Sequence, residues 1–159
     1  LPQTLRQGST TFVNLRSTVS GFAWRGGPED PLAHWLPELN ERGIRREIWM
    51  TRIVDAAAAL EARGWPEDAR GELGLEIEDG WFPWNRGRFT LEVADGQARV
   101  RPGGSGEARL DIRRLAQLYT GHLSPQSLAA MGELQIGRPA LAFASRVFAG
   151  PKPWMMDGF

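Results

Sequence analysis

The chain has 159 residues, 42% of them hydrophobic and 24% charged, which suits one full globular domain, or one domain plus a remnant of another. Basic and acidic residues number 19 each. This zero net charge argues against nucleic acid or an anionic membrane as a partner held by bulk electrostatics, and it favours self-association. Cysteine is absent and there are only two histidines, which excludes disulfides and thiolate zinc sites and leaves no metal site to predict.

We expect a cytoplasmic protein with no membrane span. No apolar run approaches the roughly 20 residues needed to cross a bilayer. The N-terminus also lacks the basic-then-apolar order of a signal peptide. The chain starts at Leu1 instead of methionine, so we expect it to begin inside a longer gene product.

Residues 1–45 do not have the pattern of an independent domain. Ser17 to Trp24 predicts a strand, and Asp30-Pro31 predicts the start of a short helix that runs through Leu36. One strand and two short helical pieces cannot bury enough apolar surface to be stable alone. This segment therefore needs a partner.

A regular pattern begins at about Arg46. The apolar run 48–54 predicts a strand covered on both faces, and Asp55 caps an alanine-rich helix, 56–63, that Gly64 ends. Further on, alternating apolar residues predict strands, with a two-residue hairpin turn at 95–96. These strands span about 73–77, 89–93, 98–100 and 108–112.

Helical spacing replaces the alternation from Ile112 onward. It predicts three helices, which span about 112–119, 125–131 and 139–148. Ser124-Pro125 starts the second of them, and Gly150-Pro151 stops the third. Strands followed by helices indicate the α+β class, with an antiparallel sheet and helices packed on one face.

Common catalytic motifs are weak in this chain. Neither His34 nor His122 has a serine–aspartate or second-histidine arrangement nearby, so both are interpreted as structural or exposed. The glycine-rich segment 103–106 lies between two strands and does not open a helix. We therefore interpret it as a flexible hairpin and not as a phosphate-binding loop.

Four carboxylates cluster on and just after one face of the first alternating strand: Glu72, Glu76, Glu78 and Asp79. A solvated outer face is the favoured interpretation. The alternative is that these groups attract a cationic amine substrate.

Seven tryptophans are a high count for this length. Trp81, Phe82 and Trp84 lie in a turn between strands, where they could line a pocket or an interface, or fill the edge of the core. No basic groove is interleaved with them, so a stacking surface for single-stranded nucleic acid is disfavoured.

The C-terminal tail, residues 151–159, stays apolar up to Phe159. An apolar terminus indicates packing against other groups, which would bring the ionised α-carboxylate into a partly buried site. Burying an unpaired charge is costly, so a partner or a chemical role is expected. The residues alone leave simple core packing and a functional role equally open.

Three stretches together resemble the Eis-like GNAT acetyltransferases, the enhanced-intracellular-survival family. They are 26–32, GGPEDPL; 49–55, WMTRIVD, which leads into the alanine-rich helix and Gly64-Trp65; and 153–159, PWMMDGF. The resemblance implies that residues 1–45 are the end of a preceding GNAT region. Residues 46–159 would then be a sterol-carrier-protein-like domain that ends in an active-site tail.

The resemblance also implies a function. The complete protein would transfer an acetyl group from acetyl-CoA to a primary amine, with the Phe159 carboxylate as the catalytic base and with Trp154, Asp157, Trp81 and Trp84 as substrate contacts. Expected partners are the GNAT domains that precede this segment and further copies of the same protein. The family's glycine-spaced acetyl-CoA motif and its catalytic tyrosine are absent here, since the only tyrosine is Tyr119 in another region. The segment alone is therefore expected to bind no cofactor and to be inactive. A lipid-binding carrier module without catalysis is the alternative.

Overall fold

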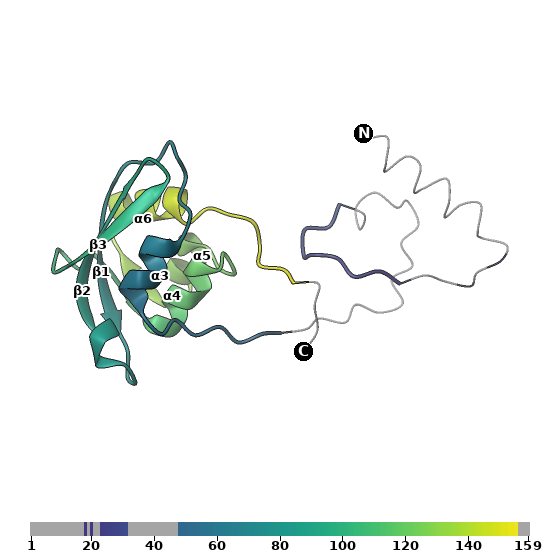
Figure 1. The fold of residues 1–159 in the computed structure, drawn as a ribbon, viewed down its shortest axis with the longest axis horizontal. Coiled ribbons are helices and arrows are strands. Elements are labelled where there is room, and N and C mark those ends of the chain that lie inside the picture. The colour runs from purple at the N-terminus through teal and green to yellow at the C-terminus, as the bar shows by residue number, and fades with distance from the viewer. Residues whose placement is uncertain (1–17, 19, 21–22, 32–47, 156–159) are drawn as a thin grey trace.

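A computed structural model describes residues 18, 20, 23–31 and 48–155 of the chain. The regular elements lie between residues 56 and 147 and are shown in Figure 1. In chain order they are α3 (Ala56–Ala62), β1 (Gly71–Glu78), η1 (Pro83–Asn85), β2 (Gly87–Ala94), β3 (Gln97–Pro102), β4 (Ala108–Asp111), α4 (Ile112–Tyr119), α5 (Pro125–Ala130), β5 (Leu134–Ile136) and α6 (Arg138–Val147).

The five strands form one sheet in the order β3-β2-β1-β4-β5, and the helices lie on one side of it (Figure 1). This arrangement confirms the predicted α+β class. Three of the four pairings are antiparallel as expected, but β1 and β4 run parallel, so the sheet is mixed. The predicted GNAT remnant, residues 1–45, falls mostly outside the described residues, which include only 18, 20 and 23–31 of it.

The core lies between the sheet and the helices. Alternate residues of β1 and β2 point into it, and helices α3 to α6 supply the opposing apolar side chains. Full burial of one such aliphatic side chain contributes about 1.5–3 kcal/mol. The largest fully buried apolar side chains are Leu60, Leu73, Leu75, Ile77, Leu91, Val93, Leu115, Leu128 and Val147.

Local signals in the sequence fix several boundaries. Asp95 and Gly96 both have positive φ, 52° and 75°, as the predicted hairpin turn between β2 and β3 requires. Asp55 caps α3 by accepting a 3.0 Å hydrogen bond from the Ala58 amide, and the Ser124 side chain caps α5 by accepting one from the Ser127 amide. These predictions are confirmed.

The glycine-rich segment 103–106 is not a hairpin, and that prediction is wrong. It carries the chain from β3 to β4 across the polar faces of β2 and β1. From β3 to β4 the chain crosses three interstrand spacings, which amount to about 14 Å. The five residues between these strands can span roughly 17 Å, which is only slightly more. The crossing is therefore nearly straight and lies directly on the sheet. A Cβ built on Gly74 of β1 would sit 2.9 Å from the Gly106 nitrogen and 2.0 Å from Ser105 Oγ.

Residues 48–54 do not form the predicted strand. Ile53 is buried at 5% exposure, but Ile48 and Met50 are 84% and 100% exposed. The run has no strand beside it to complete its backbone hydrogen bonds, and it is held by side chains instead. Strand β5 was not predicted, because its three residues are too few to establish an alternation.

We predict that Gly74→Ala lowers the unfolding temperature of the chain. The new Cβ would collide with the backbone of the crossing segment, and overpacking of this kind costs about 1–3 kcal/mol. Gly64→Ala is the matched control, because nothing lies within 4 Å of its added Cβ. Equal thermal stability of the two variants would contradict the tight crossing.

Candidate functional site

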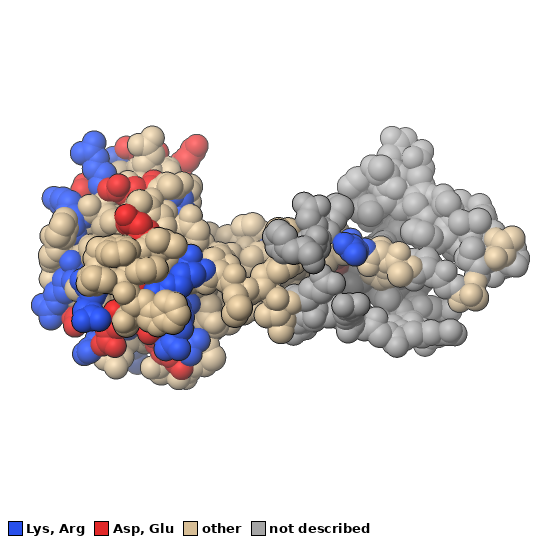
Figure 2. All heavy atoms as spheres, turned by 60° about the horizontal axis from the view of Figure 1, so that its bottom comes forward, with Lys and Arg blue, Asp and Glu red and all other residues tan. Residues whose placement is uncertain are grey.

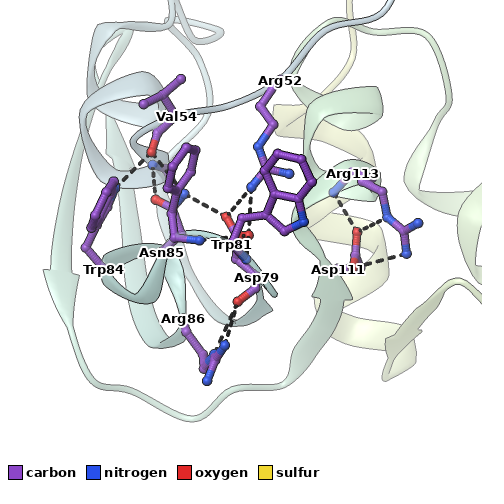
Figure 3. A network of polar contacts seen from close by, with 11 residues as sticks. Arg52, Val54, Asp79, Trp81, Trp84, Asn85, Arg86, Asp111 and Arg113 are labelled. Carbon is purple, nitrogen blue, oxygen red and sulfur yellow. Dashed lines mark hydrogen bonds and ion pairs between the residues drawn. The ribbon is translucent and has the colours of Figure 1, made fainter.

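A buried carboxylate organises the place where the chain enters the domain. Asp79, just after β1, is 1% exposed. Its Oδ1 accepts hydrogen bonds from Arg52 Nη2 at 2.7 Å and from the amides of Trp81 and Phe82 at 2.9 and 3.2 Å. Its Oδ2 accepts from Arg52 Nη2 and from Asn85 Nδ2, both at 3.0 Å. Figure 3 shows these groups converging on the carboxylate.

Asn85 extends this network to the chain that leads into α3. Its Nδ2 donates to the Val54 carbonyl at 3.0 Å, and its Oδ1 accepts from the Ala56 amide at 2.8 Å. The Trp84 indole donates to the same Val54 carbonyl at 2.9 Å (Figure 3). Side chains of the β1–β2 connection thus satisfy backbone groups that residues 52–56 would otherwise pair in a strand.

The Asp79 carboxylate is held in its ionised form. Burial by itself raises the pKa of Asp79, but hydrogen bonds from Asn85, the Trp81 amide, Arg52 and the Phe82 amide outweigh it and hold the pKa well below its ordinary value. A carboxylate with a lowered pKa does not exchange protons near neutral pH. The network is therefore suited to fixing the position of the chain and not to acid–base catalysis.

Aromatic rings cover the outside of the network. The Arg52 guanidinium lies 5.3 Å from the Trp81 ring centre and 4.9 Å from that of Phe82. Phe82 stacks on Trp84 with ring centres 4.8 Å apart. Trp81 and Trp84 are 80% and 59% exposed, so they do not fill the edge of the core. The two other interpretations, that they line a pocket or an interface, stay predictions.

The negative charges of the acidic strand face are balanced by arginines. Arginines of neighbouring strands pair with its carboxylates: Arg101 with Glu72, Arg88 with Glu76 and Arg109 with Glu78. Figure 2 shows basic and acidic side chains interleaved over the domain. This supports the favoured interpretation of a solvated outer face for Glu72, Glu76 and Glu78, but that interpretation is wrong for Asp79, which is buried. An open groove of about 560 Å³ beside this face is lined by Arg86 and by four acidic residues, Glu76, Glu78, Asp79 and Asp111.

The tail contacts the segment 23–31. Trp154 is 47% exposed, and a Cβ built on Gly27 would lie 3.2 Å from its Cγ. Segment 23–31 is turned back at this point, because the Asp30 amide donates to the Gly27 carbonyl at 3.1 Å. Asp157 and Phe159, predicted to contact substrate and to act as base, lie outside the described residues.

The predicted site residues thus fall into two groups. Trp81 lies against Arg52 and Trp84 bonds to the Val54 carbonyl, both in the β1–β2 connection, while Trp154 lies against Gly27. Within the described part of the chain, no ring contact or hydrogen bond joins Trp154 to the other two tryptophans. His122 is exposed, as predicted, and its carbonyl accepts a hydrogen bond from Lys152. No group of three or more potential metal ligands occurs among these described residues. They also contain no helix long and apolar enough to cross a membrane.

Sequence reasoning missed the roles of Arg52 and Asn85. Arg52 falls inside the 49–55 stretch that carries part of the resemblance, but it was assigned to a strand. A basic residue within an apolar run was the available signal, because a buried strand rarely carries an unpaired charge. Asn85 gave no signal, since an asparagine in a turn is common.

Comparison with known proteins identifies the family. Residues 56–156, well over half of the chain, match the model of the sterol carrier protein domain. The chain belongs to this family. The fold described above, a mixed sheet with helices on one face, is thus a sterol-carrier-type domain.

Relatives of the chain are longer N-acetyltransferases. An uncharacterized N-acetyltransferase of Streptomyces avermitilis is 34% identical over 155 residues, which are 94% of this chain and 35% of that protein. The N-acetyltransferase Eis of Mycobacterium tuberculosis is 37% identical over 131 residues, 76% of this chain and 31% of the relative. The crystal structure of a GCN5-related N-acetyltransferase from Anabaena variabilis matches with a TM-score of 0.85 and 43% identity, over 94% of this chain and 39% of that one. The chain therefore spans about a third of the length of its curated relatives, and the Eis-like resemblance is confirmed.

We predict that Asp79→Asn lowers the free energy of unfolding by about 3 kcal/mol at pH 7, because it leaves Arg52 without its buried partner. The folded-state pKa is lowered, so the stabilisation is complete above the unfolded pKa of about 3.9 and is lost as the pH falls further. The difference between wild type and variant should therefore narrow below about pH 4 in urea unfolding experiments.

Asp95→Asn is the matched control for this prediction. Asp95 pairs with Arg70 on the surface, both side chains being about 70% exposed, and exposed pairs contribute about 0–1 kcal/mol. Asparagine also tolerates the positive φ of this position. Equal losses in the two variants would show that the Asp79 network does not stabilise the domain.

Proposed function

We propose that the chain is the C-terminal region of an acetyl-CoA-dependent N-acetyltransferase that acts on a primary amine. The observation that carries the proposal is its similarity, over 94% of its length, to proteins named N-acetyltransferases that are about three times as long. On this view residues 1–45 complete a preceding GNAT region that binds acetyl-CoA. The present segment binds no cofactor and is inactive without that region.

In this proposal the tail delivers the terminal carboxylate to the reacting amine. The Phe159 carboxylate accepts a proton from the substrate ammonium group. The freed amine nitrogen then bonds to the acetyl carbon, and the bond from that carbon to the sulfur of coenzyme A breaks. The nitrogen loses one further proton and the departing thiolate takes one up, so that the products are an amide and the thiol of coenzyme A. Two features of the described chain support this role. Residues 48–55 and 149–155 leave the domain in the same direction (Figure 1), and Trp154 already contacts segment 23–31.

The other predicted site residues belong to the same proposal. Trp154 and Asp157 would contact the amine substrate from the tail. Trp81 and Trp84 would offer exposed indole surface beside the Asp79 network. Aromatic faces of this kind attract cationic groups. We also propose that several copies of the complete protein assemble, since the chain carries no net charge to oppose association.

Lipid binding is a second candidate, favoured by the name of the matched family. A carrier would have no use for a C-terminal carboxylate. Dependence of an acetylation reaction on Phe159 therefore separates the two functions.

We predict that deletion of Phe159 from the complete protein lowers kcat/KM for the amine by about 10²-fold or more, as expected for loss of a general base. The unfolding temperature should change little, because the buried apolar core of the described residues is formed by side chains between Ile53 and Phe148. The control is a variant with one glycine added after Phe159, which keeps a terminal carboxylate but moves it by about 3.5 Å, and it should also lose activity. Unchanged kcat/KM in both variants would rule out the catalytic role.

A further inference from the structure

After α6 the chain passes over the turn that ends α4. A Cβ built on Gly121 would lie 2.8 Å from the Pro151 carbonyl oxygen, so the two backbones are in direct contact. The next residues on each side are joined as well, because Lys152 Nζ donates to the His122 carbonyl at 2.9 Å. The tail therefore has two contacts with the domain immediately after it leaves the last helix.

Gly121 has the backbone conformation that makes this contact possible. Its φ is +74°, and its amide donates to the Leu118 carbonyl at 3.0 Å, so it is the left-handed residue that ends α4. Any other residue would place a side-chain carbon where the tail runs. The absence of a side chain at Gly121 thus serves both the helix end and the tail.

Arg63 fixes the two helix ends from which this arrangement is built. Its Nε donates to the Tyr119 carbonyl at 3.2 Å, at the end of α4. Its Nη1 donates to the Val147 carbonyl at 3.3 Å, at the end of α6. The guanidinium also lies 5.4 Å from the ring centre of Phe148. A cation at two helix C-termini is favourable, and it ties the start of the tail to the turn that receives it.

Downstream of this contact the tail reaches segment 23–31 at Gly27, where Trp154 packs. Five residues follow Trp154 in the sequence, and in the proposed function the last of them carries the terminal carboxylate. They can extend over roughly 17 Å at most. The position of residues 151–154 therefore limits the region that the carboxylate can reach.

We propose that the Gly121-His122 turn is a seat for the C-terminal tail, and that Gly121 is a positioning residue for the acetyl transfer. This inference rests on the proposed function, because positioning matters only if the terminal carboxylate reacts. The seat acts through the tail: contact with Pro151 and Lys152 sets its direction, and the packing of Trp154 on Gly27 completes the path.

The test is Gly121→Asn in the complete protein, with Gly132→Asn as its matched control. Both glycines end a helix with nearly the same φ, +74° and +75°, and asparagine tolerates this conformation at either site. The two sites differ in their surroundings, because nothing lies within 4 Å of a Cβ built on Gly132. A difference between the variants therefore reports the contact with the tail and not backbone strain.

Two quantities are measured in each variant: kcat/KM for the amine, and the rate at which carboxypeptidase A releases phenylalanine from the C-terminus. Gly121→Asn should lower kcat/KM about tenfold to a hundredfold, with KM for acetyl-CoA unchanged, because a small misplacement of a reacting group has effects of this size. It should also release phenylalanine faster than the wild type. Gly132→Asn should leave both quantities within about twofold of the wild type.

Equal phenylalanine release in the two variants would overturn the seat. Faster release from Gly121→Asn with unchanged kcat/KM would overturn the positioning role. In that case the Phe159 deletion shows which idea has failed. If the deletion still abolishes activity, only the positioning inference is wrong; if the deletion is harmless, the proposed catalytic function is wrong too.

Discussion

The buried carboxylate of Asp79 is the interaction on which the chain's path into the domain depends. An isolated carboxylate inside a protein is costly, and this one is satisfied by Arg52, by Asn85 and by two backbone amides. The side chains around this carboxylate hold the backbone of residues 52–56 in place, although that segment pairs with no strand. Because Asn85 also bonds to the Ala56 amide, the same network sets where α3 begins. Replacing one member would leave the others with unsatisfied buried groups, so the set acts as a unit.

Two separate anchors therefore hold the two segments that leave the domain. The leading segment, residues 48–55, is tied at Asp79, and the tail is tied at the turn after α4. Arg63 links that turn to the end of α6. Glu72, Glu76 and Glu78 on the polar face of the sheet pair with arginines of other strands and take no part in either anchor. A domain built in this way can direct both segments toward a neighbouring region. This is the role that the proposed acetyltransferase function requires of it.

Much of this fold could be predicted from the sequence, because many of its elements depend on interactions between residues close together in the chain. The caps at Asp55 and Ser124, the turn at 95–96 and the alternation in β1 and β2 each depend on a few neighbouring residues. The parallel pairing of β1 with β4 could not be predicted, since it depends on a short crossing that the glycines of 103–106 allow. The run 48–54 was misjudged because its apolar residues resemble a buried strand, while its backbone is paired by distant side chains. Trp81 and Trp84 were recognised as an aromatic group, but the role of Arg52, which lies against Trp81, was not.

The proposed function requires this domain to deliver its own C-terminal carboxylate to an acetyltransferase site formed with the preceding region. The most direct test is an experimental structure of the complete protein with coenzyme A and an amine substrate bound. In that structure we expect a carboxylate oxygen of Phe159 within hydrogen-bond reach of the amine nitrogen, about 2.6–3.2 Å, with the tail seated at Gly121. A Phe159 carboxylate in open solvent, or folded back on the sterol-carrier-type domain away from both ligands, would contradict it.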